Sequence, residues 1–491
     1  MRSCLSLKFL LPLFWLSISL TAISRSTLGR PGKSPWEHPH WLETRQARSL
    51  TSNTSRSGQP LVIDTFQDFD QNDLGFWHGT GEDLETEHEP GVMRLFPSDP
   101  DQNFHTQLNS QGCFSLSPWA NQFLHVVFEG NREFTVSLNE HNAECNAARL
   151  PFPGTADSVQ SSRYLLETAQ PEGKGVGTSD AKRGSSSTQP MPEPGPQIDD
   201  ISQVHDTKHQ ANGALQTGRL ELYIPLSHFH VNLDRLISVS LNGFYTDEPI
   251  ALHRIEIVPT VPAPSDENDN FTLPKKLPTG TLVLRCKRPN SFAFGIDDGQ
   301  PQFAQEVMQI LDDEKVRATF FVVASGLRDE TTNFTAFYRE MLSKGHQVAL
   351  HSNTHPKLEE LQDLDEIDDE IIQSIETLRN ELQVASKYFR PPFGTVGARL
   401  RQELAKYIDN PTIVNWSVDV EDWLWANSDT PERQLDAFYR GVARGGNLAV
   451  MHYLHPSTVT YLRPFIHYVK SQGLQIMRVD QCLEDPTSPP V

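Results

Sequence analysis

From Thr281 to the end of the chain, short apolar runs alternate with amphipathic segments of helical length, and this rhythm restricts the fold more than any other feature. The runs that read as buried strands are FAFGI, ATFFVVA, HQVALH, KYFRPP, TIVNWSVDV, NLAVMH and LQIMRVD. Strands separated by helices favour a parallel α/β sheet, here a distorted, incomplete (β/α) barrel of about seven strands. In such folds the functional side chains gather at the carboxyl ends of the strands.

Titratable residues stand at those strand ends. Asp297 and Asp298 end the first run, and the motif HSNTH places His351 and His355 after the third. If the HSNTH loop turns helically, its two imidazoles share a face and can bind one metal ion together with a carboxylate. Such a ligand set leaves positions open for water and substrate, which is the pattern of a catalytic divalent metal. The second carboxylate can then act as a general base.

Other strand ends carry a second group of motifs. The consecutive prolines of RPPFG give a rigid exit from the fourth run, and Arg390 can orient a carboxylate through its planar guanidinium. The motif DVEDW follows, and His452 in VMHYLH can protonate a leaving group. Each motif alone has a plain structural explanation, such as a polar loop or a satisfied histidine. Their combination favours catalysis.

The order IDDG, HSNTH, RPPFG, DVEDW and VMH resembles the five motifs of the NodB-type polysaccharide deacetylases, carbohydrate esterase family 4, over about residues 281–485. The first four family motifs usually read TFDDGP, H[ST]xxH, RPP[YF]G and DxxDW. Within this family, the chain most resembles fungal chitin deacetylases. The resemblance implies removal of N-acetyl groups from a chitin-like polymer of N-acetylglucosamine by metal-activated water. An O-acetyl esterase acting on acetylated xylan is the alternative, and a non-catalytic cell-wall sugar-binding protein is a third.

The resemblance also implies roles for individual residues. By position, Asp297 would be the general base, oriented by Arg390. His452 would be the general acid, with its pKa supported by Asp422.

The implied metal ligands are Asp298, His351 and His355, and the expected ion is divalent, with zinc preferred and cobalt as the alternative. Phe393 would donate a backbone N–H that stabilises the oxyanion together with the metal. Trp423 and Val450 would line the acetyl methyl group.

The motifs also depart from the family pattern. Gly295 and Ile296 stand where Thr and Phe are usual, and Gln300 is inserted before the proline of the first motif. In the fifth motif, Val450 and Tyr453 replace Leu and Asp. Every implied catalytic group is retained, so we expect activity, with the loop that carries Asp297 shaped for its own substrate.

Residues 61–259 have a different pattern, in which β-prone runs such as FLHVVFEG and RLELYIPL alternate with turn residues. This favours an all-β sandwich, followed by a linker over 260–280. DTFQDF near its start and ALHRIEIV near its end resemble galactose-binding-like jelly rolls, and that resemblance implies a carbohydrate-binding role. The polar stretch 157–215 is interpreted as a disordered insertion. Trp77, His78 and Trp119 could form a sugar platform, although buried core aromatics are the favoured alternative.

The N-terminus carries Arg2 and Lys8 before about fifteen mostly apolar residues, and small residues suit cleavage after Ser24. This predicts a signal peptide over 1–24 and a secreted, extracellular or cell-wall protein. A signal anchor is the alternative, although a comfortable membrane helix needs roughly 20 apolar residues. Residues 25–59, rich in Ser, Arg, Pro and Gly, are interpreted as a linker.

The cysteines fit secretion. Cys4 would leave with the signal, and the remaining cysteines, which permit several pairings, are Cys113, Cys145, Cys286 and Cys482. Pairing Cys113 with Cys145 and Cys286 with Cys482 keeps each bond inside one candidate domain. In many fungal relatives, a cysteine before the first motif bridges one near the C-terminus, as Cys286 and Cys482 would.

Glycosylation sequons begin at Asn53, Asn270, Asn333 and Asn415, of which Asn415 lies in an apolar run and is expected to be buried and unmodified. The formal net charge of −21 disfavours nucleic acid or an anionic membrane as partner, since both need clustered Lys and Arg. The expected partner is a cell-wall polysaccharide, and we expect a monomer.

Overall fold

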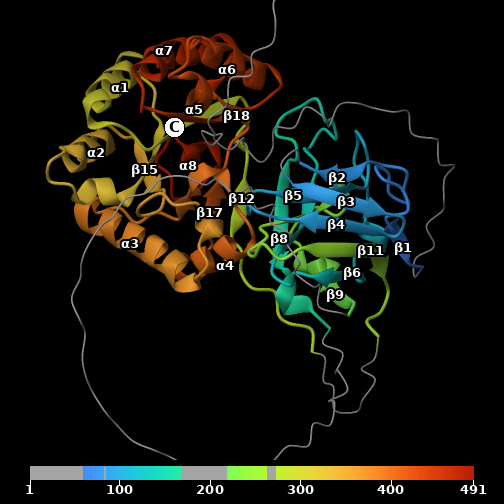
Figure 1. Ribbon diagram of the computed structural model, residues 1–491. Coiled ribbons are helices and arrows are strands. Elements are labelled where there is room, and N and C mark those ends of the chain that lie inside the picture. Colours follow the sequence, from blue (N-terminus) through green and yellow to red (C-terminus); the bar gives the residue numbers. More distant parts are fainter. Residues whose placement is uncertain (1–58, 82–83, 167–217, 263–271) are drawn as a thin grey trace, which may run out of the picture. The chain divides into compact units, whose positions relative to one another are not determined.

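The computed structural model describes residues 59–81, 84–166, 218–262 and 272–491 (Figure 1). The predicted signal peptide, most of the first linker and the sequons at Asn53 and Asn270 lie outside the described residues. Within the described residues, no helix has the length and apolar character needed to cross a membrane.

The N-terminal region contains two antiparallel sheets, as the strand pattern predicts (Figure 1). One has the order β3-β4-β11-β6-β9, with β1 also paired to β11, and the other has the order β2-β5-β10-β7-β8. Apolar side chains of both sheets form one core, which includes Leu95, Phe128, Val136 and Leu241. The strands are β1 (Leu61–Asp64), β2 (His78–Thr80), β3 (Glu85–Glu89), β4 (Val92–Phe96), β5 (Asn103–Gln107), β6 (Phe123–Gly130), β7 (Thr135–Glu140), β8 (Thr155–Gln160), β9 (Leu220–Pro225), β10 (Leu236–Asn242) and β11 (Ile250–Val258).

The start of the predicted disordered insertion is wrong. Strand β8 lies partly inside the stretch 157–215 and pairs with β7 along its whole length. Its polar residues Asp157 and Ser158 are buried, and Ser158 shares a hydrogen bond of 2.9 Å with Ser137. Because buried polar residues replace apolar ones here, the strand reads as a loop in the sequence. Residues 167–217 lie outside the described part of the chain.

Of the three residues considered for a sugar platform, Trp119 and His78 are buried, as the favoured alternative predicts, and cannot form such a platform. Trp119 is buried in the sandwich core and donates its indole N–H to the carbonyl oxygen of Gln59 at 3.1 Å. His78 is buried, with its Nδ1 2.6 Å from Oδ2 of Asp64. Trp77 is half-buried. Carbohydrate binding by the sandwich stays a prediction.

The C-terminal region forms a curled parallel sheet with the order β12-β17-β16-β15-β14-β13-β19-β18, and β20 pairs with the start of β13. Among the described strands, β12 and β18 end the sheet without pairing to each other, so the barrel is incomplete, as predicted. The strands are β12 (Thr281–Val283), β13 (Ser291–Asp297), β14 (Thr319–Val322), β15 (Gln347–Leu350), β16 (Tyr388–Phe389), β17 (Thr412–Val414), β18 (Val418–Asp419), β19 (Leu448–His452) and β20 (Gln475–Ile476).

Helices surround the outside of this sheet (Figure 1). They are α1 (Pro301–Asp313), α2 (Phe334–Ser343), α3 (Leu364–Leu382), α4 (Ala398–Tyr407), α6 (Arg433–Ala443) and α7 (Pro456–Ser471), with the short α5 (Asp422–Trp425) and α8 (Val479–Cys482) at the ends of strands. Each long helix contacts the next in the ring α6, α7, α1, α2, α3, α4. Their apolar sides pack on outward-facing strand residues such as Phe294, Ile296 and Met451.

The run TIVNWSVDV, expected to be one strand, is split into β17 and β18. Between them, Asn415 donates its backbone N–H to the carbonyl oxygen of Val283 at 3.0 Å and its side-chain amide to that of Gly394 at 2.9 Å. The chain leaves this position in a new direction, and β17 pairs with β12 and β16 while β18 pairs with β19. Asn415 is buried, as the sequence predicts.

Alternate residues of the strands point into the barrel, because side chains of a strand alternate between its two faces. At one end this interior is apolar, with Ala293, Phe321, Ala349 and Leu448 in a cluster that also includes Val479 and Cys482 of α8. We call this the closed end. The C-terminal segment therefore plugs the barrel opposite the carboxyl ends of β13, β15 and β19, which we call the open end.

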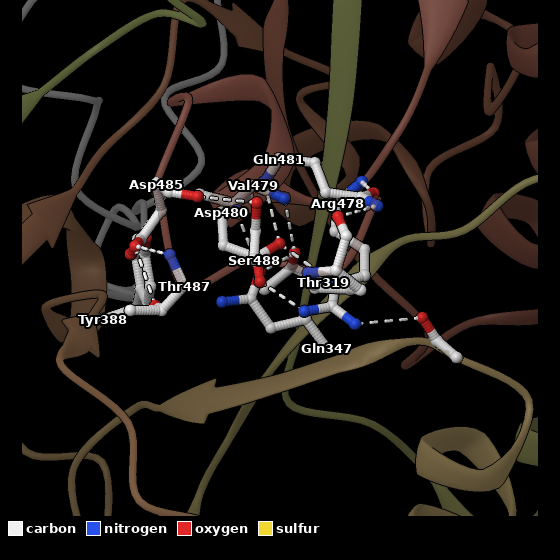
Figure 2. Close-up of polar contacts among 12 residues, drawn as sticks. Thr319, Gln347, Tyr388, Arg478, Val479, Asp480, Gln481, Asp485, Thr487 and Ser488 are labelled. Atoms are coloured by element: carbon white, nitrogen blue, oxygen red, sulfur yellow. Dashed lines mark hydrogen bonds and ion pairs between the residues drawn. The ribbon is translucent and has the colours of Figure 1, made fainter. Parts of the chain in front are cut away.

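Polar residues of the closed end are paired with this plug (Figure 2). Thr319 accepts the backbone N–H of Val479 at 2.8 Å and donates to Gln347 at 2.7 Å, and Gln347 accepts the N–H of Asp480 at 3.2 Å. The disulfide between Cys286 and Cys482 fastens the same segment. Cys113 and Cys145 form the other disulfide, so the structure contains both predicted bonds.

Candidate active site

Asp297 and Asp298 begin the site at the open end of β13. Asp297 is the last residue of the strand and is 2% exposed, and its register partners are Phe321 and His452. Asp298 follows in the left-handed region, with φ of +53°. This backbone turn carries its carboxylate toward β15.

Two histidines approach that carboxylate. Nε2 of His351 and of His355 lie 3.5 Å and 3.6 Å from Oδ1 of Asp298. The ligand atoms of all three residues lie within 4.8 Å of one another. The structure therefore brings the three predicted ligands together.

The loop between the histidines is not helical, which corrects the expected reason for their convergence. Ser352 and His355 instead have φ of +62° and +68°, and Ser352 Oγ accepts the backbone N–H of His355 at 3.0 Å. Glu370 of α3 accepts the backbone N–H groups of Asn353 and Thr354, each at 2.8 Å. Sequence reasoning missed Glu370, because nothing distinguishes it from the other acidic residues of that helix.

Arg390 connects Asp297 to His351. Its buried guanidinium donates to Oδ1 of Asp297 at 2.6 Å and to the carbonyl oxygen of Val414 at 2.9 Å. Its backbone carbonyl accepts Nδ1–H of His351 at 2.7 Å. That bond fixes the tautomer of His351 and leaves Nε2, with its lone pair, facing Asp298.

Gly295 explains how the guanidinium of Arg390 fits inside the barrel. A Cβ at Gly295 would overlap that guanidinium, which also lies 4.1 Å from the ring centre of Phe321. The absence of a side chain at Gly295, unusual for this motif, therefore makes room for the partner of Asp297. The sequence marks Gly295 as a departure but does not show what occupies the space.

His452 and Asp422 form a second pair across the open end. Asp422, the first residue of α5, accepts the backbone N–H of His452 at 2.6 Å and pairs with its Nδ1 at 2.8 Å. Nδ1 must be the donor if the carboxylate is charged, so Nε2 is left for other partners. The sequence predicts this pair correctly.

Burial and charge together set the protonation of these groups. Burial lowers the pKa of His351 to about 3, so its imidazole is neutral and able to bind a metal. Burial raises the pKa of Asp297, and the charges of Arg390 and His452 only partly offset this effect. Burial lowers the pKa of His452, but Asp422, with smaller contributions from Asp298 and Asp297, outweighs it and raises the pKa to about 10.

The three residues expected to contact substrate lie around these groups. Phe393 is 55% exposed, has φ of +61°, and its ring centre is 4.9 Å from that of His355. Trp423 is half-buried and follows Asp422 in α5. Val450 is buried in β19, two residues before His452 and on the same interior face.

Comparison with known proteins agrees with this geometry. A model described as polysaccharide deacetylase matches residues 285–408, a range that contains the Asp297–Asp298 pair, both histidines and Arg390. A chitin deacetylase from Pestalotiopsis sp is 29% identical over 213 residues, which are 43% of this chain and 70% of that protein. The chitin deacetylase of Colletotrichum lindemuthianum is 28% identical over 218 residues, 43% of this chain and 86% of that protein. The chain carries a polysaccharide deacetylase domain.

Other comparisons cover the same deacetylase domain. A peptidoglycan-N-acetylglucosamine deacetylase of Listeria monocytogenes is 28% identical over 200 residues, which are 40% of each chain. The solved structure of the Colletotrichum lindemuthianum chitin deacetylase is 27% identical, covers 43% of this chain and 94% of that one, and has a TM-score of 0.39. The family resemblance of the motifs is confirmed, and with it the expectation of a deacetylase-type hydrolase of carbon–nitrogen bonds.

Proposed function

We propose that this chain removes N-acetyl groups from a chitin-like polymer of N-acetylglucosamine. The observation that carries the proposal is the convergence, at one open end, of a three-residue ligand set flanked by two carboxylate–cation pairs. One pair suits a base and the other an acid, which is what hydrolysis of an unreactive amide requires.

The donor set fits a divalent metal. Oδ1 of Asp298 is buried and has no hydrogen-bond partner among the described residues, and Nε2 of His351 and of His355 face it. One carboxylate with two histidines is a ligand set used for catalytic zinc, and cobalt accepts the same donors. When bound, such an ion supplies Lewis-acid chemistry, polarising the acetyl carbonyl and lowering the pKa of water.

Asp297 is the general base. Arg390 occupies Oδ1, and Oδ2 faces the ligand set, 3.8 Å from Nε2 of His351. Oδ2 is therefore the atom that takes a proton from the attacking water. The guanidinium holds the carboxylate in one orientation, because Arg390 is itself fixed by Val414.

His452 is the general acid. An amine is a poor leaving group until its nitrogen is protonated, so amide hydrolysis needs a proton donor on the leaving side. Asp422 keeps His452 protonated at neutral pH and orients its ring through Nδ1. Nε2–H then points away from Asp422 and delivers the proton to the sugar nitrogen.

The remaining contacts bind the acetyl group. The backbone N–H of Phe393 stabilises the developing oxyanion, and its exposed ring offers the sugar an apolar surface. Trp423 and Val450 line the methyl group on the acid side. A secreted or cell-wall location completes the proposal, and the disulfides are consistent with an oxidising compartment.

The test measures acetate released by the full chain, loaded with zinc, from chitin oligomers, peptidoglycan and acetylated xylan. We expect release from N-acetylglucosamine oligomers. Asp297→Asn should reduce it by a factor of at least about 10³, near the upper range for a general base, while metal content stays the same. Release from acetylated xylan alone would favour the O-esterase alternative, and full activity of Asp297→Asn would exclude the mechanism.

A further inference from the structure

Two buried tyrosines connect the strand of His452 to the loop of Asp298. Tyr453 follows His452, and its hydroxyl lies 2.7 Å from that of Tyr338 in α2. The Tyr338 hydroxyl donates to the backbone carbonyl of Asp298 at 3.1 Å. A tyrosine hydroxyl has a single proton, so Tyr338 must accept from Tyr453. The result is a directed bridge from Tyr453 through Tyr338 to Asp298.

Tyr453 also holds the loop at two further points. Its backbone carbonyl accepts the N–H of Gln300 at 3.2 Å. Its ring lies over Gly299, where a Cβ would overlap the ring. Gly299 has φ of +134°, so glycine is favoured there by backbone conformation as well as by space.

Asp298 needs this outside support because its own conformation is unfavourable. A non-glycine residue with positive φ is strained and keeps that conformation only because its surroundings hold it there. The backbone N–H of Asp298 donates to the carbonyl oxygen of Phe321 at 3.2 Å, and its carbonyl accepts from Tyr338. Its buried Oδ1, by contrast, has no hydrogen-bond partner among the described residues. The direction of the carboxylate is therefore set through the backbone.

We propose that Tyr453 and Tyr338 are positioning residues, which hold the Asp297–Asp298 loop in the geometry for metal binding and couple it to the strand of His452. The inference rests on the proposed function only in taking Asp298 as a metal ligand. Neither tyrosine touches the substrate, because Tyr453 and Tyr338 are 0% and 2% exposed. They act through Asp298.

The test compares Tyr453→Phe and Tyr338→Phe with the unmodified full chain. Each variant keeps its ring and loses one hydroxyl. Zinc affinity is measured by chelator competition without substrate, and kcat and KM are measured separately on chitin oligomers. Tyr388→Phe is the matched control, because the Tyr388 hydroxyl donates to Asp485 at the closed end. All proteins are also compared by the Tm of their metal-free forms.

We expect both site variants to bind zinc on the order of 10-fold more weakly, as changes to the partners of metal ligands do, with lower kcat and unchanged KM. The double variant should bind zinc no more weakly than the single variant with the lower zinc affinity, because both hydroxyls belong to one continuous chain of hydrogen bonds. Tyr388→Phe should lower Tm and leave zinc affinity unchanged. Site variants that lower Tm but keep the unmodified zinc affinity and kcat would overturn the proposal. Zinc affinity is measured without substrate, so an unmodified chain lacking deacetylase activity would count against the proposed function and leave this test intact.

Discussion

The two ends of the barrel interior differ in how their buried polar groups are bonded. At the closed end, Thr319 and Gln347 are bonded to each other and to backbone N–H groups of the C-terminal plug (Figure 2). At the open end, just after β13 and β16, Oδ1 of Asp298 and Nη2 of Arg390 are buried without a hydrogen-bond partner among the described residues. The polar groups of the closed end named here are bonded within the protein, whereas some of those at the open end are left available to a ligand.

This difference suggests that polar residues at the closed end serve stability and those at the open end serve function. A buried polar group without a partner costs about 1–3 kcal/mol, so the open end destabilises the fold unless a ligand fills it. The closed end has no such cost in the bonds described above. Changes at the open end should therefore remove activity with little loss of stability, and changes at the closed end should do the reverse.

The largest effect is expected from His355→Ala, which removes one of the three proposed metal ligands at the open end. The His355 side chain is 26% exposed, so its loss leaves little buried cavity. Zinc affinity should fall by a factor of at least about 100, and acetate release should fall below detection. The Tm of the metal-free protein should change little. A large fall in that Tm would contradict the idea that open-end residues serve activity rather than stability.

Gly295→Ala should have the next largest effect, because the added methyl group would displace the guanidinium of Arg390 from Asp297. A misplacement of this size costs on the order of 10²-fold in kcat/KM. Gly326→Ala is the control, since its Cβ would meet Phe334 at an ordinary 3.4 Å. Equal activity of the two variants would exclude the role given to Gly295.

Asp422→Asn should move the alkaline limb of the pH–rate profile. As the proposed general acid, His452 would act in its protonated form, so activity should be lost as pH rises through its pKa, which Asp422 raises to about 10. Without that carboxylate the pKa falls toward its ordinary value, and the limb should move down by at least about one pH unit. The acid limb should stay in place. An unmoved alkaline limb of kcat/KM would mean that His452 is not the acid.

The smallest effect on activity is expected at the closed end, from Asp485→Asn. Burial opposes charge on Asp485, but hydrogen bonds from Lys387 and Tyr388 outweigh it and lower the pKa of its carboxyl. A carboxyl with a lowered folded-state pKa stabilises the fold above its unfolded pKa of about 3.9 and loses that contribution as pH falls. Urea unfolding at pH 7 should show a loss of about 1–3 kcal/mol.

The same variant gives an internal check. The difference in unfolding free energy between Asp485→Asn and the unmodified protein should become smaller below about pH 4. In that range the Asp485 carboxyl of the unmodified protein begins to be protonated in the unfolded chain. At pH 7 and 25 °C, kcat should be unchanged. A reduced kcat would mean that the C-terminal segment at the closed end also influences the geometry of the open end.

The amino-acid sequence is enough to predict the strand and helix alternation, the five motifs and the residues at the strand ends. Each of these is a local pattern, of period two in strands or of fixed spacing in a motif. The ligand set, the Arg390–Asp297 pair and the His452–Asp422 pair all follow from strand ends meeting at one edge of the sheet. The expected helical turn of the HSNTH loop is wrong, because left-handed residues such as Ser352 and His355 have no local signal.

The sequence by itself therefore determined which chemical groups stand at the open end. The tertiary structure alone decided what holds them there. Gly295 makes room for the guanidinium of Arg390, the residue after β16, Glu370 of α3 bonds the histidine loop, and Tyr338 of α2 bonds Asp298. These contacts join residues far apart in the chain, and each depends on space or direction that exists only after the strands and helices have packed.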